Sequence, residues 1–158
     1  MNHLKPFVLR FTLSYLLIQA SIGLLAIALD AMFGIDIPST AITVTALGLT
    51  VALISHQFIK KYSRIFNQQE RFYMAWTSVL ASWLVSLILI TILIAGFTVY
   101  NDLTVSSLLR ELPNDKLFFI IMSIALVFTT LLMWGLLYWM YGYIPKQLLK
   151  SSSKIANS

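Results

Sequence analysis

The chain has 158 residues, of which 59% are hydrophobic and only 11% are charged, and its mean hydropathy is +0.84. These values lie outside the usual range of soluble globular domains and predict an integral membrane protein. The net charge of +5 does not indicate nucleic-acid binding, because the order of the charges along the chain explains it as a topology signal. The sequence contains no cysteine, which excludes disulfides, thiolate metal sites and thiol nucleophiles.

Four apolar stretches of spanning length predict an all-α fold, a polytopic four-transmembrane-helix bundle that forms one membrane domain. The first stretch is about 35 Å long as a helix, which is enough to cross a bilayer. A cleaved signal peptide is the alternative for this stretch, but the apolar run is longer than a usual signal-peptide core, so we expect a retained anchor. We expect the spans at about residues 11–33, 41–59, 72–100 and 117–141 of the 1–158 chain.

Two short patterns predict where helices begin. Pro38 precedes Ser39 and Thr40, either of which can cap the second helix. Asn67 is followed by Glu70 three residues later, which predicts a capping box at the start of the third helix. Glu70 is therefore expected to have a structural role.

Two segments lie outside the predicted spans. Leucines recur among polar residues in 103–112, which predicts a short amphipathic helix on the outer membrane surface. Residues 142–158 are basic, end in serines and include a proline, so we expect a mobile tail.

The charges predict that both termini face the cytoplasm, because loops on that side carry the excess of Lys and Arg. The acidic Glu70 falls on the inside and the other five acidic residues fall outside, so the net charges are +8 inside and −3 outside. Only Arg110 and Lys116 are basic and outside. The basic residues assigned to the inside are Lys5, Arg10, Lys60, Lys61, Arg64, Arg71, Lys146, Lys150 and Lys154.

Aromatic residues gather where the third span begins and where the fourth span ends, as expected for anchors at a membrane interface. A ligand-binding aromatic box is the alternative interpretation of the same residues. They are Phe72, Tyr73 and Trp76 at the first boundary and Trp134, Tyr138, Trp139, Tyr141 and Tyr143 at the second.

Four polar residues inside the spans are candidates for intramembrane contacts: Gln19, Thr45, Thr50 and His56. Gln19 is the most deeply placed large polar side chain, about 13 Å from the end of its span, and we expect it to contact span two, where Thr50 lies at similar depth. His56 lies one helical turn before Lys60, near the end of the span, so its side chain can reach interfacial water. It is therefore expected to be an interfacial hydrogen-bonding residue and not a metal ligand.

Small residues at a spacing of four predict close helix packing on two spans. Gly48 and Ala52 form such a row on span two, and Ser78, Ser82 and Ser86 form another on span three. A serine nucleophile would need a base, and no His, Lys or acidic residue shares this row at its depth.

The basic loop between spans two and three contains Lys60, Lys61 and Arg64, which are candidates to contact anionic lipid headgroups. An acidic partner is the alternative for these residues. The chain contains no phosphate-binding glycine loop, zinc-site pattern or paired carboxylates, so we expect no enzyme activity, no catalytic or metal site and no cofactor.

The arrangement IPSTAI at 37–42, followed by HQFIKKYSRIFNQQERFYMAW at 56–76, resembles a family of small four-helix inner-membrane proteins of Gram-negative bacteria. This resemblance implies a bacterial inner-membrane location and the same topology. Small multidrug exporters also have four helices, but the essential glutamate of their first helix has no counterpart here, where Gln19 is the nearest polar residue.

Two functions are consistent with the sequence. The first is a non-enzymatic inner-membrane protein that acts through helix packing or surface contacts as an accessory, scaffold, regulatory or immunity-type protein. Its partner would be another membrane protein or a second copy of the chain. The second is a small transporter or channel subunit that works as an oligomer, with the four polar candidates lining a path between helices.

Overall fold

The computed structural model describes residues 2–100 and 116–156, and this part of the chain contains only helices and short connections. A 3₁₀ turn at Asn2–Leu4 leads into α1 (Lys5–Phe33), which is followed by α2 (Ser39–Tyr62), α3 (Gln68–Tyr100) and α5 (Lys116–Ala156). All four helices are long and apolar enough to cross a membrane. The predicted all-α class and the four apolar helices are thus confirmed. The expected amphipathic segment at 103–112 lies outside the described residues.

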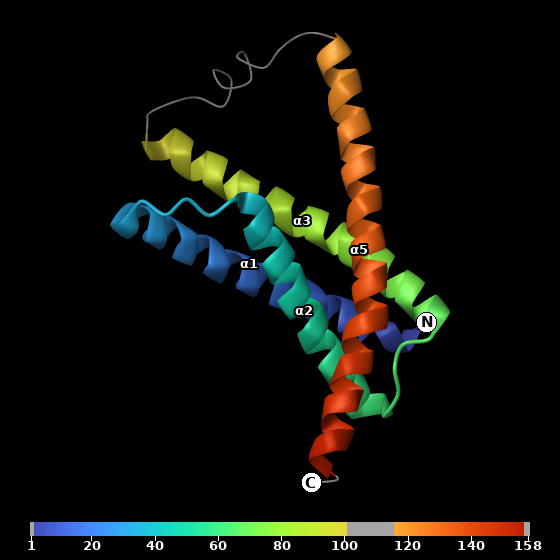
Figure 1. Cartoon of the computed structure of the whole chain (residues 1–158). Coiled ribbons are helices and arrows are strands. Elements are labelled where there is room, and N and C mark those ends of the chain that lie inside the picture. Colours follow the sequence, from blue (N-terminus) through green and yellow to red (C-terminus); the bar gives the residue numbers. More distant parts are fainter. Residues whose placement is uncertain (1, 101–115, 157–158) are drawn as a thin grey trace.

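The helices pack in a cyclic order, in which α1 contacts α2 and α3, and α5 contacts the same two helices. Figure 1 shows α1 and α3 running side by side, while α2 and α5 cross them. Because α1 and α3 begin at the same end of the bundle at which α2 and α5 finish, the basic residues near these helix ends come together. We call this the basic end, formed by residues 2–10, 58–72 and 141–150.

The core occupies the half of the bundle near the basic end. Aromatic side chains fill much of it, and Phe58 stacks on Phe66 with ring centroids 3.9 Å apart. Phe66 in turn meets Tyr141 edge to face at 5.4 Å. The buried apolar residues are Leu4, Phe7, Phe11, Tyr15, Ala46, Leu47, Val51, Ile54, Phe58, Phe66, Met74, Ala75, Val79, Ala81, Val85, Leu137 and Tyr141.

The other half of the bundle is splayed. The first turns of α5 extend away from the other helices (Figure 1), and nearly every large apolar side chain between Leu117 and Leu132 is exposed. In a bilayer such side chains meet lipid tails, so their exposure carries no penalty. The basic half is therefore the packed half, and the opposite half leaves helix faces uncovered.

The helix ends differ from the sequence expectation in three places. Pro38 is the residue before α2, and no side chain caps the helix, so Ser39 lies in its first turn. Helix α3 begins four residues before the predicted span at 72–100, because the Asn67 cap precedes that span. The tail expected to be mobile from residue 142 is helical as far as Ala156.

Helix α5 continues past Tyr141 although Pro145 removes one backbone hydrogen-bond donor from its interior. Pro145 is buried, and Ile144 packs against the core. These contacts hold the chain in helical form where local sequence favours a break. Tertiary packing thus overrides the local signal.

Candidate functional site

A polar network at the basic end joins three separate segments of the chain. Glu70, on the first turn of α3, accepts two hydrogen bonds from the Arg64 guanidinium, each 2.7 Å long. The Nε2 atom of His3 lies 3.0 Å from the same carboxylate. The backbone N–H of Asn67 donates to Glu70 at 2.9 Å, and the Asn67 side chain accepts from the Glu70 backbone N–H at 2.8 Å. The predicted capping box is therefore confirmed, and the carboxylate also ties the N-terminus to the α2–α3 loop.

This network changes how the basic loop is interpreted. The bond to Glu70 raises the pKa of the Arg64 guanidinium, which remains charged and directed at the carboxylate. Lys61 lies over the rings of Tyr62 and Phe7, with its Nζ atom 5.4 and 5.9 Å from their centroids. Of the three predicted headgroup contacts, Lys60 and Lys61 have exposed side chains, whereas Arg64 is held by the protein itself.

The serine row on α3 divides between two environments. Ser78 is buried, and its hydroxyl lies 2.9 Å from the hydroxyl of Tyr141 on α5. Ser82 is also buried and donates to the Ser78 carbonyl at 2.8 Å. Ser86 lies further along and lines an open groove described below. The first two serines therefore lie on the buried side of α3, where Ser78 contacts α5.

On α2, Gly48 faces α5. A Cβ atom built at Gly48 would lie 3.6 Å from the Cε of Met140, which is ordinary van der Waals contact. Ala52, one turn later, is partly buried. The small residue at position 48 thus lets α5 approach this face of α2.

The four polar candidates are not brought together. Thr50 is buried and donates to the carbonyl of Ala46 in its own helix at 2.7 Å. Thr45 and His56 have exposed side chains on α2. The groove that Gln19 lines contains none of these three residues. In the part of the chain that the structure describes, Gln19 therefore lines a groove that Thr45, Thr50 and His56 do not share.

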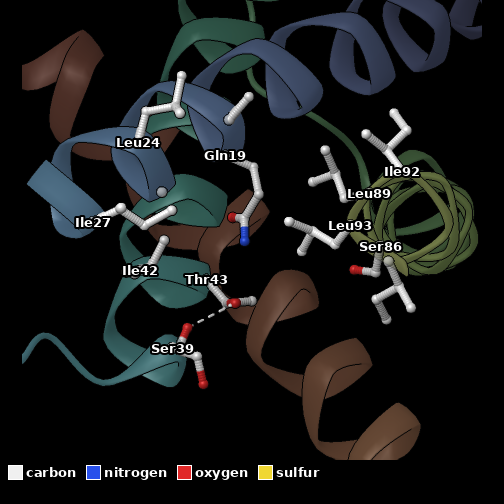
Figure 2. Close-up of a pocket in the computed structure, with 13 residues that line it drawn as sticks. Gln19, Leu24, Ile27, Ser39, Ile42, Thr43, Ser86, Leu89, Ile92 and Leu93 are labelled. Atoms are coloured by element: carbon white, nitrogen blue, oxygen red, sulfur yellow. Dashed lines mark hydrogen bonds between the residues drawn. The ribbon is translucent and has the colours of Figure 1, made fainter. Parts of the chain in front are cut away.

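Gln19 instead opens into a groove between α1, α2 and α3, in the splayed half of the bundle. Figure 2 shows its side chain extending from α1 into this space, with Thr43 of α2 below and Leu93 of α3 beside it. The groove has a volume of about 540 Å³. Several of its walls are exposed side chains, so it is open at the bundle surface. Its lining is Gln19, Ala20, Gly23, Leu24, Ile27, Ser39, Ile42, Thr43, Ser86, Leu89, Ile90, Ile92 and Leu93.

The amide of Gln19 is the largest polar group of this groove. Its Oε1 atom is buried and has no hydrogen-bond partner. Thr43, by contrast, already donates to the Ser39 carbonyl at 3.0 Å, shown as a dashed line in Figure 2. A buried carbonyl oxygen without a donor is unfavourable by about 1–3 kcal/mol. The groove is therefore mainly apolar, and its polar groups are the Gln19 amide and the hydroxyls of Ser39, Thr43 and Ser86.

The contact of Gln19 with span two stays a prediction. The α2 residues that line the groove with Gln19 are Ser39, Ile42 and Thr43. The sequence analysis also missed Ala20 and Gly23, which share the groove wall with Gln19. Their small size beside a polar residue on α1 was the signal that could have indicated it. A Cβ added to Gly23 would meet no atom within 4 Å, so space remains beside this wall.

Within residues 2–100 and 116–156, no three His, Cys, Asp or Glu side chains lie close enough to hold a metal ion. Comparisons of the chain with models of known families, with curated proteins and with solved structures find no match. The resemblance to small inner-membrane proteins of Gram-negative bacteria therefore stays a prediction. The candidate site rests on geometry alone.

Proposed function

We propose that this chain is a non-enzymatic, multi-pass protein of a bacterial inner membrane that binds a transmembrane helix of another membrane protein in the Gln19 groove. In this arrangement both termini lie in the cytoplasm, which agrees with the clustering of Lys and Arg at the basic end. Its role would be that of an accessory, regulatory or immunity-type subunit. The single observation that carries the proposal is the open, mainly apolar groove between three helices, into which the Gln19 side chain extends with an amide oxygen that has no hydrogen-bond partner.

A transmembrane helix suits this groove for two physical reasons. Lipid removes the hydrophobic drive for helix association, so close approach at small residues and interhelical hydrogen bonds provide the affinity. Ala20, Gly23 and Ser86 supply small residues on two facing helices. Gln19 supplies an acceptor for a Ser, Thr, Asn or Trp donor on the partner, whose bond would be formed in surroundings without competing water.

The transporter alternative has less support. A conducting path would need polar groups along its length, whereas the groove is lined mainly by aliphatic side chains. Thr45 and His56, which were candidates for such a path, lie on the exposed surface of α2 instead. We therefore favour partner binding over conduction.

Photo-crosslinking in native membranes tests the proposal with two matched positions. Benzoylphenylalanine would replace Leu24, which lines the groove and is 69% exposed, or Leu17, which lies on the same helix outside the groove and is 66% exposed. We expect a discrete protein adduct from position 24 only. We also expect Gln19→Leu, which replaces the amide with an apolar side chain of similar size, to reduce the yield of that adduct severalfold.

The outcomes separate the possible occupants. An adduct with twice the mass of the chain would identify the partner as a second copy, and a different mass would identify another protein. Lipid adducts alone at position 24, equal protein adducts at both positions, or an adduct insensitive to Gln19→Leu would each overturn the proposal.

A further inference from the structure

A second pocket lies at the basic end, between the beginning of α3 and residues 138–146 of α5. It has a volume of about 260 Å³ and is lined by Arg71, Tyr138, Trp139, Gly142, Tyr143 and Lys146. It shares no residue with the Gln19 groove. Its lining also differs in chemistry, because it contains two cations and two phenol rings, whereas the groove is lined mainly by aliphatic side chains.

The position of Arg71 is fixed by two neighbours. Its Nε donates to the carbonyl of Phe66 at 3.2 Å, which anchors one edge of the guanidinium. Its Nη1 atom lies 2.9 Å from the place that a Cβ of residue 142 would occupy. The guanidinium thus lies close against the α5 backbone at Gly142, where a larger residue would require it to shift. Its charge lies at the pocket in this position.

The second cation and the aromatic wall come from one face of α5. Lys146 follows Gly142 by four residues, so it lies one turn further along the same face. Trp139 and Tyr143 are stacked with centroids 5.0 Å apart and ring planes 10° from parallel. Tyrosine and tryptophan side chains favour the headgroup level of a membrane, where an apolar ring and a polar tip are both accommodated.

No acidic residue lines this pocket. Glu70 is adjacent in sequence to Arg71, but its carboxylate is occupied by Arg64, His3 and the Asn67 backbone. The two cations therefore have no acidic side chain beside them among the residues that line the pocket. A guanidinium beside an ammonium and hydroxyl donors is a combination that suits a phosphate group.

From this geometry we propose that Arg71 and Lys146 bind a phosphate group at the basic end, supplied by an anionic phospholipid headgroup or by a soluble phosphate compound. The aromatic wall holds the apolar side of the ligand, and the phosphate lies between the two cations. This site is distinct from the Lys60, Lys61 and Arg64 loop, whose arginine is already paired with Glu70.

Native mass spectrometry of the detergent-purified full chain tests the proposal with phosphatidylglycerol and with zwitterionic phosphatidylcholine. The wild-type chain should retain phosphatidylglycerol preferentially. We expect Arg71→Gln with Lys146→Gln to weaken that binding about thirtyfold, since each basic residue near a membrane surface contributes roughly fivefold. Lys5→Gln is the control for Lys146→Gln, because it removes one exposed positive charge at the same end from a side chain that does not line the pocket, and it should weaken binding less than Lys146→Gln does.

A separate arm measures inorganic phosphate binding through the fluorescence of the chain, in which Trp139 lines the pocket. Saturation at millimolar phosphate that disappears in the Arg71/Lys146 variant, without preference for phosphatidylglycerol, would assign the site to a soluble phosphate compound. The single variant Lys146→Gln keeps the test valid if the double variant misfolds, because this side chain is exposed on α5 and its replacement should leave the fold intact. It should weaken binding about fivefold. Equal losses in the lysine control, or no binding in either arm, would overturn the proposal.

Discussion

Replacing Glu70 with glutamine should destabilise the basic end strongly, although the two side chains have nearly the same size and shape. The Glu70 side chain is almost completely buried, with 4% of the residue exposed. Its carboxylate faces two N–H donors of Arg64 at 2.7 Å, the Asn67 backbone N–H at 2.9 Å and His3 Nε2 at 3.0 Å. A glutamine NH₂ group cannot accept from Arg64 or from the Asn67 N–H. If it replaces Oε2, the bonds from Arg64 Nη1 and Asn67 lose their acceptor, and if it replaces Oε1, the bond from Arg64 Nη2 does.

The magnitude follows from the same contacts. A hydrogen bond to a charged group contributes roughly 1.5–3 kcal/mol. Water compensates part of the loss at Arg64, whose side chain is 46% exposed. We therefore expect Glu70→Gln to reduce the free energy of unfolding by about 2–4 kcal/mol.

Unfolding of the protein from bicelles by titrated dodecyl sulfate, followed by tryptophan fluorescence, measures this change. Asp30→Asn is the matched control, because it removes one carboxylate from an exposed position and should change stability by less than about 0.5 kcal/mol. The double variant Arg64→Gln/Glu70→Gln should lose less than the sum of the single variants. Additive losses, or a Glu70→Gln effect below about 1 kcal/mol, would show that the network does not hold the fold.

Two further predictions concern hydroxyl groups inside the bundle, and the same assay measures both. Tyr141→Phe and Ser78→Ala should each reduce the free energy of unfolding by about 1 kcal/mol, because the two hydroxyls are 2.9 Å apart in a buried helix contact. The double-mutant cycle should give a coupling energy of about 0.6–1.7 kcal/mol. A coupling energy of zero would contradict the bond. Thr50→Val should change stability by less than about 1 kcal/mol, because the Thr50 hydroxyl donates only to Ala46 in its own helix; a loss comparable to that of Tyr141→Phe would indicate an interhelical role.

The sequence predicted the features that depend on apolar length and local spacing. The four helices follow from runs long enough to cross a bilayer, and the reciprocal bonds of Asn67 and Glu70 follow from their separation of three residues. Such patterns are reliable because they need no knowledge of a neighbouring helix. The helical continuation through Pro145 is the counterexample, since it depends on contacts with the core.

The sites depended on information that the sequence does not contain, namely how the helices are rotated and where they diverge. Thr45, Thr50 and His56 all occur on α2, but the rotation of the helix buries only Thr50. Tyr141 was expected to be an interfacial anchor and is instead buried against Phe66 and Ser78. Arg71 was counted only as a topology charge, because nothing local indicates that Gly142 makes room for it.

The two halves of the bundle use the same devices for helix contact, and they differ in whether open space lies beside them. Buried polar atoms without a partner occur in both halves, at Tyr15 and Ser55 as well as at Gln19. In the packed half, Gly48 admits Met140 and the Ser78 hydroxyl meets Tyr141. In the splayed half, Gly23 adjoins open space and the Gln19 oxygen has no donor. Helices in lipid associate through small residues and hydrogen bonds, so an unfilled pair of this kind favours association with a further helix. This contrast is why we assign partner binding to the Gln19 groove and not to the exposed apolar face of α5, where the Ser123 hydroxyl already donates to the Phe119 carbonyl of its own helix.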